Sequence, residues 1–136
     1  MVWGADWRDP FVFWNPEEKL FFMLVCATTN DGPVAKRGCV GLAKSHDLEK
    51  WECHPPFYAP NICGPMECPD LFQLGGRWYL VFSEFTENLQ THYRVADDFK
   101  GFLTCSDTGC FKRAAFLRCE DCWRRGKEIL IRIGSD

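Results

Sequence analysis

The feature that most constrains the fold is an internal repeat of two strand pairs. The first copy is DPFVF at residues 9–13 followed by KLFFMLV at 19–25, and the second is CPDLF at 68–72 followed by RWYLVF at 77–82, an offset of 58 to 59 residues. Each copy has a proline at the start of a short strand, then a turn and a longer apolar strand. Gly75-Gly76 predicts a tight hairpin in the second copy, because glycine accepts the positive φ that such turns require.

Three further segments have the pattern of strands, at residues 38–44, 51–57 and 91–96. The first unit then has four strands, followed by a connection over residues 58–66. A repeat of this length with about four strands in each copy is typical of propeller blades. An antiparallel sheet with two ordinary hairpins is the alternative that the pattern leaves open. We predict an all-β fold that corresponds to about two blades of a β-propeller.

Composition and charge exclude several classes of function. The chain has 136 residues, which suits about one domain, and 46% of them are hydrophobic. A net charge of −3 offers no electrostatic attraction to nucleic acid, and no apolar run approaches the roughly 20 residues that cross a membrane. We expect no nucleic-acid partner and no membrane, and the sequence leaves the oligomeric state open.

The nine cysteines are an odd number in a chain that starts without a recognisable export signal. We therefore expect reduced thiols rather than a disulfide framework, because disulfides belong to oxidising compartments. The same observation leads us to expect a cytoplasmic location for the sequence as it starts here. No cofactor is predicted.

The starts of the two repeated strands carry the candidate functional residues, Arg8-Asp9 in the first copy and Glu67-Cys68 in the second. In a propeller the first strand of each blade lines the central axis, so carboxylates from neighbouring blades can converge on one substrate. Paired carboxyl groups suit glycoside hydrolysis, because one protonates the leaving oxygen while another stabilises positive charge on the sugar. Alternatively, each residue pair caps its strand or lies on a solvated rim.

The same two segments resemble known motifs. WRDPFVFW at residues 7–14 and GPMECPDLF at 64–72 are similar to the Arg-Asp-Pro and Glu-Cys-Pro motifs of glycoside hydrolase family 32, the β-fructosidase group. Segments that also resemble the family are GCVGLAKSHDLEKWE at 38–52, WYLVFSE at 78–84 and THYRVADDFKG at 91–101. The resemblance covers roughly residues 3–101, and the two motifs in this order and at this separation are specific.

The resemblance implies a five-bladed β-propeller and the hydrolysis, with retention, of terminal β-fructofuranosides such as sucrose, fructan or sucrose-6-phosphate. By motif, Glu67 corresponds to the general acid/base and Asp9 to the transition-state stabiliser that hydrogen-bonds fructose hydroxyls. Arg8 lies beside the stabiliser and Cys68 flanks the acid, so we expect both at the substrate. The expected partner is a small fructoside.

The role of Glu67 implies a particular environment. A general acid must hold its proton near neutral pH, so we expect a neighbouring carboxylate and partial burial to raise the pKa of Glu67. A neutral Cys68 suits this environment better than a cation would. The alternative, in which the thiol is a nucleophile, needs a nearby base, and the three candidates lie in or near polar stretches: His46, His54 and His92.

A retaining hydrolase also needs a nucleophile on the other side of the sugar. In the family it is an Asp in an Asn-Asp-Pro motif that precedes the Arg-Asp-Pro segment. Here Asn15-Pro16 lacks the Asp, Asp6 lacks the motif, and Asn30-Asp31-Gly32 is better explained as a turn. We therefore expect about two of five blades, without the nucleophile blade, and no turnover of sucrose by the isolated chain.

A function of another class is a non-catalytic carbohydrate-binding propeller piece. It would keep Arg8 and Asp9, and would use an aromatic surface such as Trp14 or Trp51 as a platform for the sugar. It would need no nucleophile. Such tryptophans also occur simply as core or rim packing residues.

The last segment, residues 105–136, departs from the family pattern and forms a tail distinct from the propeller part at 1–104. Its cysteine spacing, C-x4-C-x8-C-x2-C, is compatible with a zinc module as an alternative function: Cys105, Cys110, Cys119 and Cys122. When the tail is translated back into codons and these are read one base later, one permitted reading is a peptide similar to the next segment of the family. Our hypothesis is therefore a frameshift near Phe111–Lys112, which the coding DNA would test.

Overall fold

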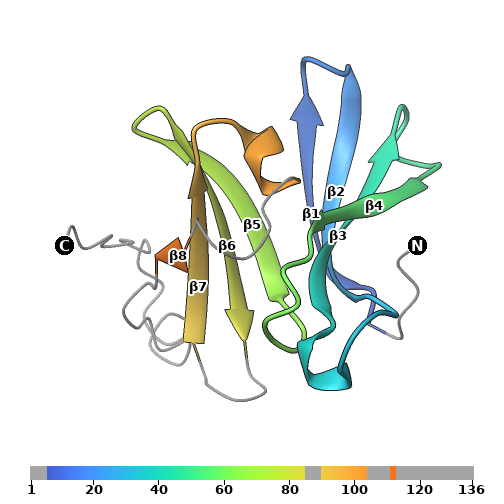
Figure 1. Cartoon of the computed structure of the whole chain (residues 1–136). Helices are drawn as coiled ribbons and strands as arrows, with labels where there is room; N and C mark the ends of the chain where they lie inside the picture. The colour runs from blue at the N-terminus through green and yellow to red at the C-terminus, as the bar shows by residue number, and fades with distance from the viewer. Residues whose placement is uncertain (1–5, 85–89, 104–110, 113–136) are drawn as a thin grey trace, which may run out of the picture.

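The chain forms two four-stranded antiparallel sheets, each in sequential strand order (Figure 1). This computed structural model describes residues 6–84, 90–103 and 111–112. Sheet A consists of β1 (Arg8–Asn15), β2 (Leu20–Thr28), β3 (Gly38–Ser45) and β4 (Glu52–Tyr58). Sheet B consists of β5 (Glu67–Leu74), β6 (Arg77–Glu84), β7 (Gln90–Ala96) and β8 (Phe111–Lys112). Two short 3-10 helices complete the described elements, η1 (Val34–Lys36) and η2 (Phe99–Phe102).

The prediction of an all-β fold of two four-stranded units is confirmed. The segments predicted at 38–44, 51–57 and 91–96 are β3, β4 and β7, each within a residue of its predicted bounds. Gly75 and Gly76 both have positive φ, 59° and 78°, as the predicted hairpin requires. No helix among residues 6–84, 90–103 and 111–112 is long and apolar enough to cross a membrane.

The fourth strand of sheet B, β8, lies in the range that the sequence assigns to the tail. It pairs with Tyr93 and Arg94 of β7. The rest of residues 105–136, with the four cysteines of the zinc hypothesis, lies outside the described residues. The frameshift and the zinc module therefore stay hypotheses.

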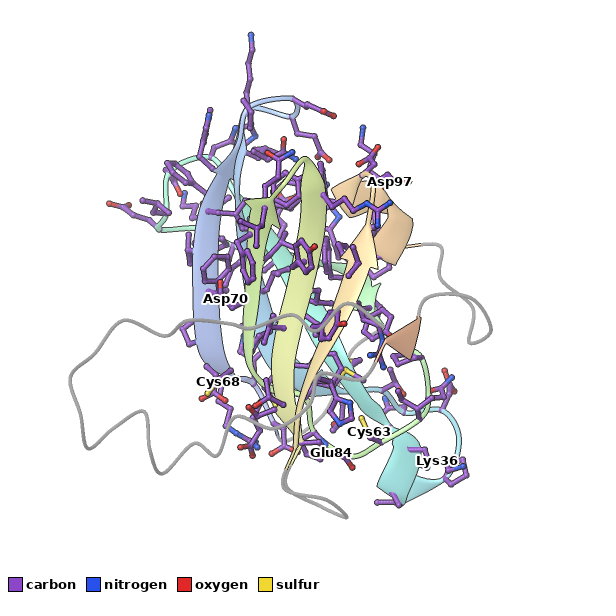
Figure 2. The ribbon with its side chains drawn as sticks, turned by 90° about the vertical axis from the view of Figure 1, so that its left-hand side faces the viewer. Lys36, Cys63, Cys68, Asp70, Glu84 and Asp97 are labelled. Atoms are coloured by element: carbon purple, nitrogen blue, oxygen red, sulfur yellow. The ribbon has the colours of Figure 1, made fainter. Side chains whose placement is uncertain are left out.

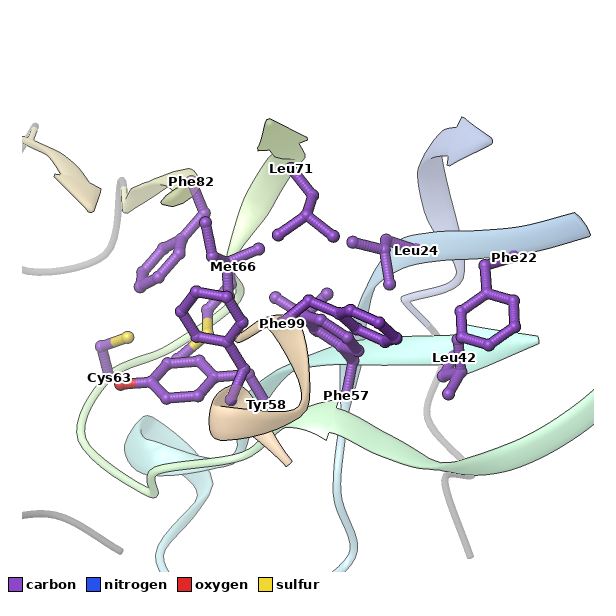
Figure 3. Packing of buried hydrophobic residues seen from close by; sticks show 13 residues of the cluster. Phe22, Leu24, Leu42, Phe57, Tyr58, Cys63, Met66, Leu71, Phe82 and Phe99 are labelled. Atoms are coloured by element: carbon purple, nitrogen blue, oxygen red, sulfur yellow. The ribbon is translucent and has the colours of Figure 1, made fainter. Parts of the chain in front are cut away.

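The two sheets pack face to face around one apolar layer (Figure 3). Phe22, Leu24 and Leu42 of sheet A face Leu71 of β5 and Phe82 of β6 across this layer. Leu24 is fully buried, and burying a side chain of this size stabilises the fold by about 2–3 kcal/mol. The layer brings β1 beside β5, so the first strands of the two repeated units are neighbours.

Gly38, at the start of β3, is where the backbone of sheet A meets the connection to sheet B. Its N–H donates to the carbonyl of Cys63 at 3.0 Å. A Cβ atom at this position would lie 1.6 Å from the carbonyl oxygen of Gly64, so only glycine allows this approach.

We therefore predict that Gly38→Ala lowers the free energy of unfolding by about 3 kcal/mol, because the backbone of the connection must move to admit the methyl group. The matched control is Gly32→Ala. Gly32 has a φ of 84° with open space around it, so this change costs only backbone strain, about 1 kcal/mol. Urea denaturation followed by circular dichroism measures both. Equal losses in the two variants would contradict the predicted contact.

Candidate active site

Each of the two neighbouring first strands begins with the same irregularity. Arg8 pairs with Cys26 and the next pair is Phe11 with Leu24, so two residues of β1 face one of β2. In β5 the register shifts in the same way between Glu67 and Asp70. Both are β-bulges, which turn side chains at the end of a strand in new directions.

The chemistry of the bulged residues suits this geometry. Asp9 and Cys68 occupy equivalent positions and both have left-handed backbone, with φ of 57° and 48°. The residue that follows each is a proline, which has no N–H to donate and is tolerated in a sheet mainly at bulges, edges and strand starts. The Asp-Pro and Cys-Pro steps seen in the sequence are therefore the second and third residues of two equivalent bulged strand starts.

Two contacts join these strand starts. Arg8 Nη2 donates to Glu67 Oε1 at 2.5 Å, and the backbone N–H of Cys68 donates to Asp9 Oδ2 at 3.1 Å. Each contact spans 59 residues of sequence. Figure 2 shows Cys68 at the end of the two neighbouring strands, and the side chains of Asp9 and Glu67 are about 30% exposed. The structure thus brings together all four site residues proposed from the sequence.

Asp6 is a further member of the cluster, which the sequence did not predict. Arg8 Nη1 donates to Asp6 Oδ1 at 2.6 Å, and Arg8 Nε lies 3.8 Å from Asp9 Oδ2. The hydrogen bond to Glu67 is the largest of the interactions that raise the pKa of Arg8. The Asp-x-Arg spacing in the sequence could have indicated the contact between Asp6 and Arg8, because residues two apart lie on the same side of an extended chain.

The surroundings of Glu67 differ from the expectation in one respect. The sequence predicts a second carboxylate beside Glu67, whereas the contact of Glu67 at 2.5 Å is the guanidinium of Arg8. Cys68 contributes its backbone N–H to Asp9, and its side chain is exposed. The cation and three carboxylates form one network of charged donors and acceptors, which are groups that make strong hydrogen bonds.

Other thiols near the cluster are poor nucleophiles. Burial raises the pKa of Cys26, which pairs with Arg8 across the strands, to about 11, although the charge of Arg8 acts in the opposite direction. Burial likewise raises the pKa of Cys39 to about 12. Both thiols are protonated at neutral pH, and the thiolate is the nucleophilic form.

The histidines lie in other surroundings. His46 and His54 line a cavity of about 300 Å³ beside Glu18 and Leu20, at the opposite end of sheet A from Arg8. His92 Nε2 lies 3.1 Å from Glu84 Oε2. Within the described part of the chain, no three His, Cys, Asp or Glu side chains are arranged to hold a metal ion.

Neighbouring four-stranded sheets, each in sequential strand order and with their first strands side by side, are the arrangement of blades in a β-propeller. The family model "Glycosyl hydrolases family 32 N-terminal domain" matches residues 3–113. The chain therefore belongs to glycosyl hydrolase family 32, and it contains about two blades of the propeller.

The chain is also similar to three known proteins. Sucrose-6-phosphate hydrolase of Zymomonas mobilis is 36% identical over 86 residues, which cover 58% of this chain and 16% of the relative. A solved variant of the Bombyx mori GH32 β-fructofuranosidase in complex with sucrose is 25% identical, with a TM-score of 0.60, and the match covers 81% of this chain and 25% of that chain. Inulosucrase from Halalkalicoccus jeotgali bound to kestose has 25% identity and a TM-score of 0.57, with 69% and 28% covered. The chain thus spans about a sixth of the length of the curated relative.

We predict a measurable but small coupling between Arg8 and Glu67. A double-mutant cycle with Arg8→Gln and Glu67→Gln should give about 0.5–1 kcal/mol of coupling in the free energy of unfolding, because solvent screens side chains exposed by about a third. The control pair is Arg77 and Asp97, which lie 3.4 Å apart but are 62% and 90% exposed. Their coupling should be close to zero. Equal coupling in the two pairs would contradict the prediction.

A second prediction concerns pH. The unfolded chain releases the Cys26 proton near its ordinary value of 9.0, and the folded chain near 11. The folded state therefore holds more protons between these values, and the free energy of unfolding should fall as the pH rises from about 9 to about 11. Cys26→Ala should flatten part of this slope, whereas Cys53→Ala, at an exposed thiol, should leave it unchanged. Urea denaturation at a series of pH values measures the slopes. An unchanged slope in the Cys26 variant would refute the assignment of this pH dependence to Cys26.

Proposed function

We propose that this chain supplies the proton donor and the transition-state stabiliser of a β-fructofuranosidase site, Glu67 and Asp9. The observation that carries the proposal is the pair of contacts between the two strand starts, Arg8 with Glu67 and Asp9 with the N–H of Cys68. These contacts hold the two carboxyl groups in one partly exposed cluster. The family membership and the sucrose, kestose and sucrose-6-phosphate in the names of similar proteins support a fructoside as substrate.

The proposed chemistry assigns a separate task to each group. Glu67 protonates the oxygen of the leaving group, and the negative charge of Asp9 stabilises positive charge on the fructose ring. The N–H of Cys68 holds the Asp9 carboxylate in place, which leaves its other oxygen for a sugar hydroxyl. Arg8 is shared by Asp6 and Glu67, so a bound hydroxyl competes with Glu67 for the guanidinium.

The nucleophile is the remaining requirement. No Asn-Asp-Pro sequence occurs among the 136 residues. We propose that a separate segment supplies this carboxylate, and that the chain by itself binds fructosides without hydrolysing them. The chain alone should not hydrolyse fructosides because protonation of the leaving group does not replace attack by a nucleophile.

Non-catalytic sugar binding is the second candidate, and one observation favours it. The ion pair of Glu67 with Arg8 suits a carboxylate that accepts hydrogen bonds from a sugar. The two tryptophans proposed as platforms for the sugar lie away from the acidic cluster or are engaged elsewhere. Trp14 lies near the far end of β1, and the Trp51 indole donates to the carbonyl of Leu48 beyond β3.

The binding part of the proposal predicts the effect of Asp9→Asn. This change removes the negative charge at the sugar, so the affinity for fructose should fall about tenfold or more. The matched control is Asp97→Asn, at a carboxylate that is 90% exposed, and this variant should bind fructose as the parent chain does. Titration of fructose followed by NMR measures both affinities. Equal binding by the parent and the Asp9 variant would exclude Asp9 from the site.

The catalytic part is tested separately by released fructose. The chain alone should release none from sucrose or inulin, and robust turnover would overturn the proposed need for another segment. Fusion behind a segment with the family's Asn-Asp-Pro motif should restore hydrolysis. Glu67→Gln in that fusion should then reduce turnover by about a hundredfold or more without loss of fructose binding. Binding without hydrolysis in the fusion would favour the non-catalytic alternative.

A further inference from the structure

Arg8 directs its three guanidinium nitrogens to three different carboxylates. Nη2 donates to Glu67 Oε1 at 2.5 Å, and Nη1 donates to Asp6 Oδ1 at 2.6 Å. Nε lies 3.8 Å from Asp9 Oδ2, which is an ion pair but too long for a hydrogen bond. A guanidinium frequently pairs with a single carboxylate through two parallel N–H···O bonds. Here its hydrogen bonds go to two carboxylates instead.

The contact of Asp6 with Arg8 is local and contributes little to stability. Asp6 lies two residues before Arg8, so this hydrogen bond does not join the two sheets. The side chains of Asp6 and Arg8 are 37% and 38% exposed, and solvent screens an ion pair with this exposure. What the contact fixes is the direction of the guanidinium, because it engages Nη1 beside the Nη2 that reaches Glu67.

Asp6 thereby competes with Glu67 for one cation. Without the Asp6 carboxylate, Nη1 has no competing acceptor at this position, and the guanidinium can turn until it donates to both oxygens of Glu67. Hydrogen bonds from a cation favour the ionised form of a carboxyl group, and two such bonds favour it more than one. A general acid must instead carry its proton when the substrate binds.

The other titratable groups around Glu67 do not replace Asp6 in this competition. They come from β1, β2 and β5, whereas the β6 residue paired with Glu67 does not titrate: Arg8, Asp9, Cys26 and Cys68, and Ser83 in β6. The Asp9 carboxylate accepts from the N–H of Cys68. Cys26 is buried and protonated at neutral pH, so it carries no charge that could attract the guanidinium.

We propose that Asp6 is a positioning residue that holds Arg8 to a single hydrogen bond with Glu67, so that Glu67 can carry the proton it donates. The inference rests on the proposed function, because it concerns the acid of that same site. Asp6 acts through Arg8 and needs no contact with the sugar.

The competition is tested in the full chain without substrate. The cycle of Arg8→Gln and Glu67→Gln is measured by urea denaturation in the parent, in Asp6→Ala and in the control Asp97→Ala, whose carboxylate pairs with Arg77 and is 90% exposed. In the Asp6→Ala background the coupling should rise to about tenfold in the equilibrium constant of unfolding, because two charge-assisted bonds replace one. The control should keep the coupling of the parent. Coupling that is unchanged or weaker in the Asp6→Ala background would overturn the proposal.

The consequence for catalysis is tested by the pH profile of the fusion that carries the Asn-Asp-Pro motif. Asp6→Ala should move the alkaline limb of kcat/KM to lower pH by about half a pH unit or more, because Glu67 then loses its proton more readily. Asp97→Ala should leave the profile in place. An alkaline limb that does not move in an active fusion would also refute the role of Asp6. A parent fusion that releases no fructose counts against the proposed function, and the coupling in the full chain still decides whether Asp6 restrains Arg8.

Discussion

The apolar layer between the two sheets is the interaction on which the rest of the structure depends. It places β1 beside β5, and only then do the two bulged strand starts meet. The ion pair of Arg8 with Glu67 is partly exposed and stabilises by no more than about 1 kcal/mol. Each buried leucine or phenylalanine of the layer contributes about 2 kcal/mol. The core therefore positions the acidic cluster, and the cluster does little to hold the sheets together.

The cluster combines equivalent positions of the two repeated units. Arg8 and Glu67 occupy equivalent positions in the two bulges, and so do Asp9 and Cys68. Because the equivalent residues differ in charge, they attract one another where the two units meet. Identical residues would place like charges together, which is unfavourable.

The two bulges carry backbone strain that the surrounding structure offsets. Left-handed backbone at Asp9 and Cys68 costs on the order of 1 kcal/mol for each residue. The hydrogen bond from the N–H of Cys68 to Asp9 spans the two bulges and satisfies a donor at one strained residue with an acceptor at the other. Strain of this kind is common where side chains serve a function rather than stability.

The sequence by itself determined the strands and the hairpin at Gly75-Gly76, because alternating apolar patterns and turn residues are local signals. Its two motifs also indicated the four residues Arg8, Asp9, Glu67 and Cys68, which the structure brings together. Only the tertiary structure decided that Glu67 contacts Arg8, where a second carboxylate was expected, and that Asp6 joins the cluster. It also decided which face of each sheet is covered. These features depend on the register of the bulges and on contacts 59 residues apart in the chain, which no local pattern encodes.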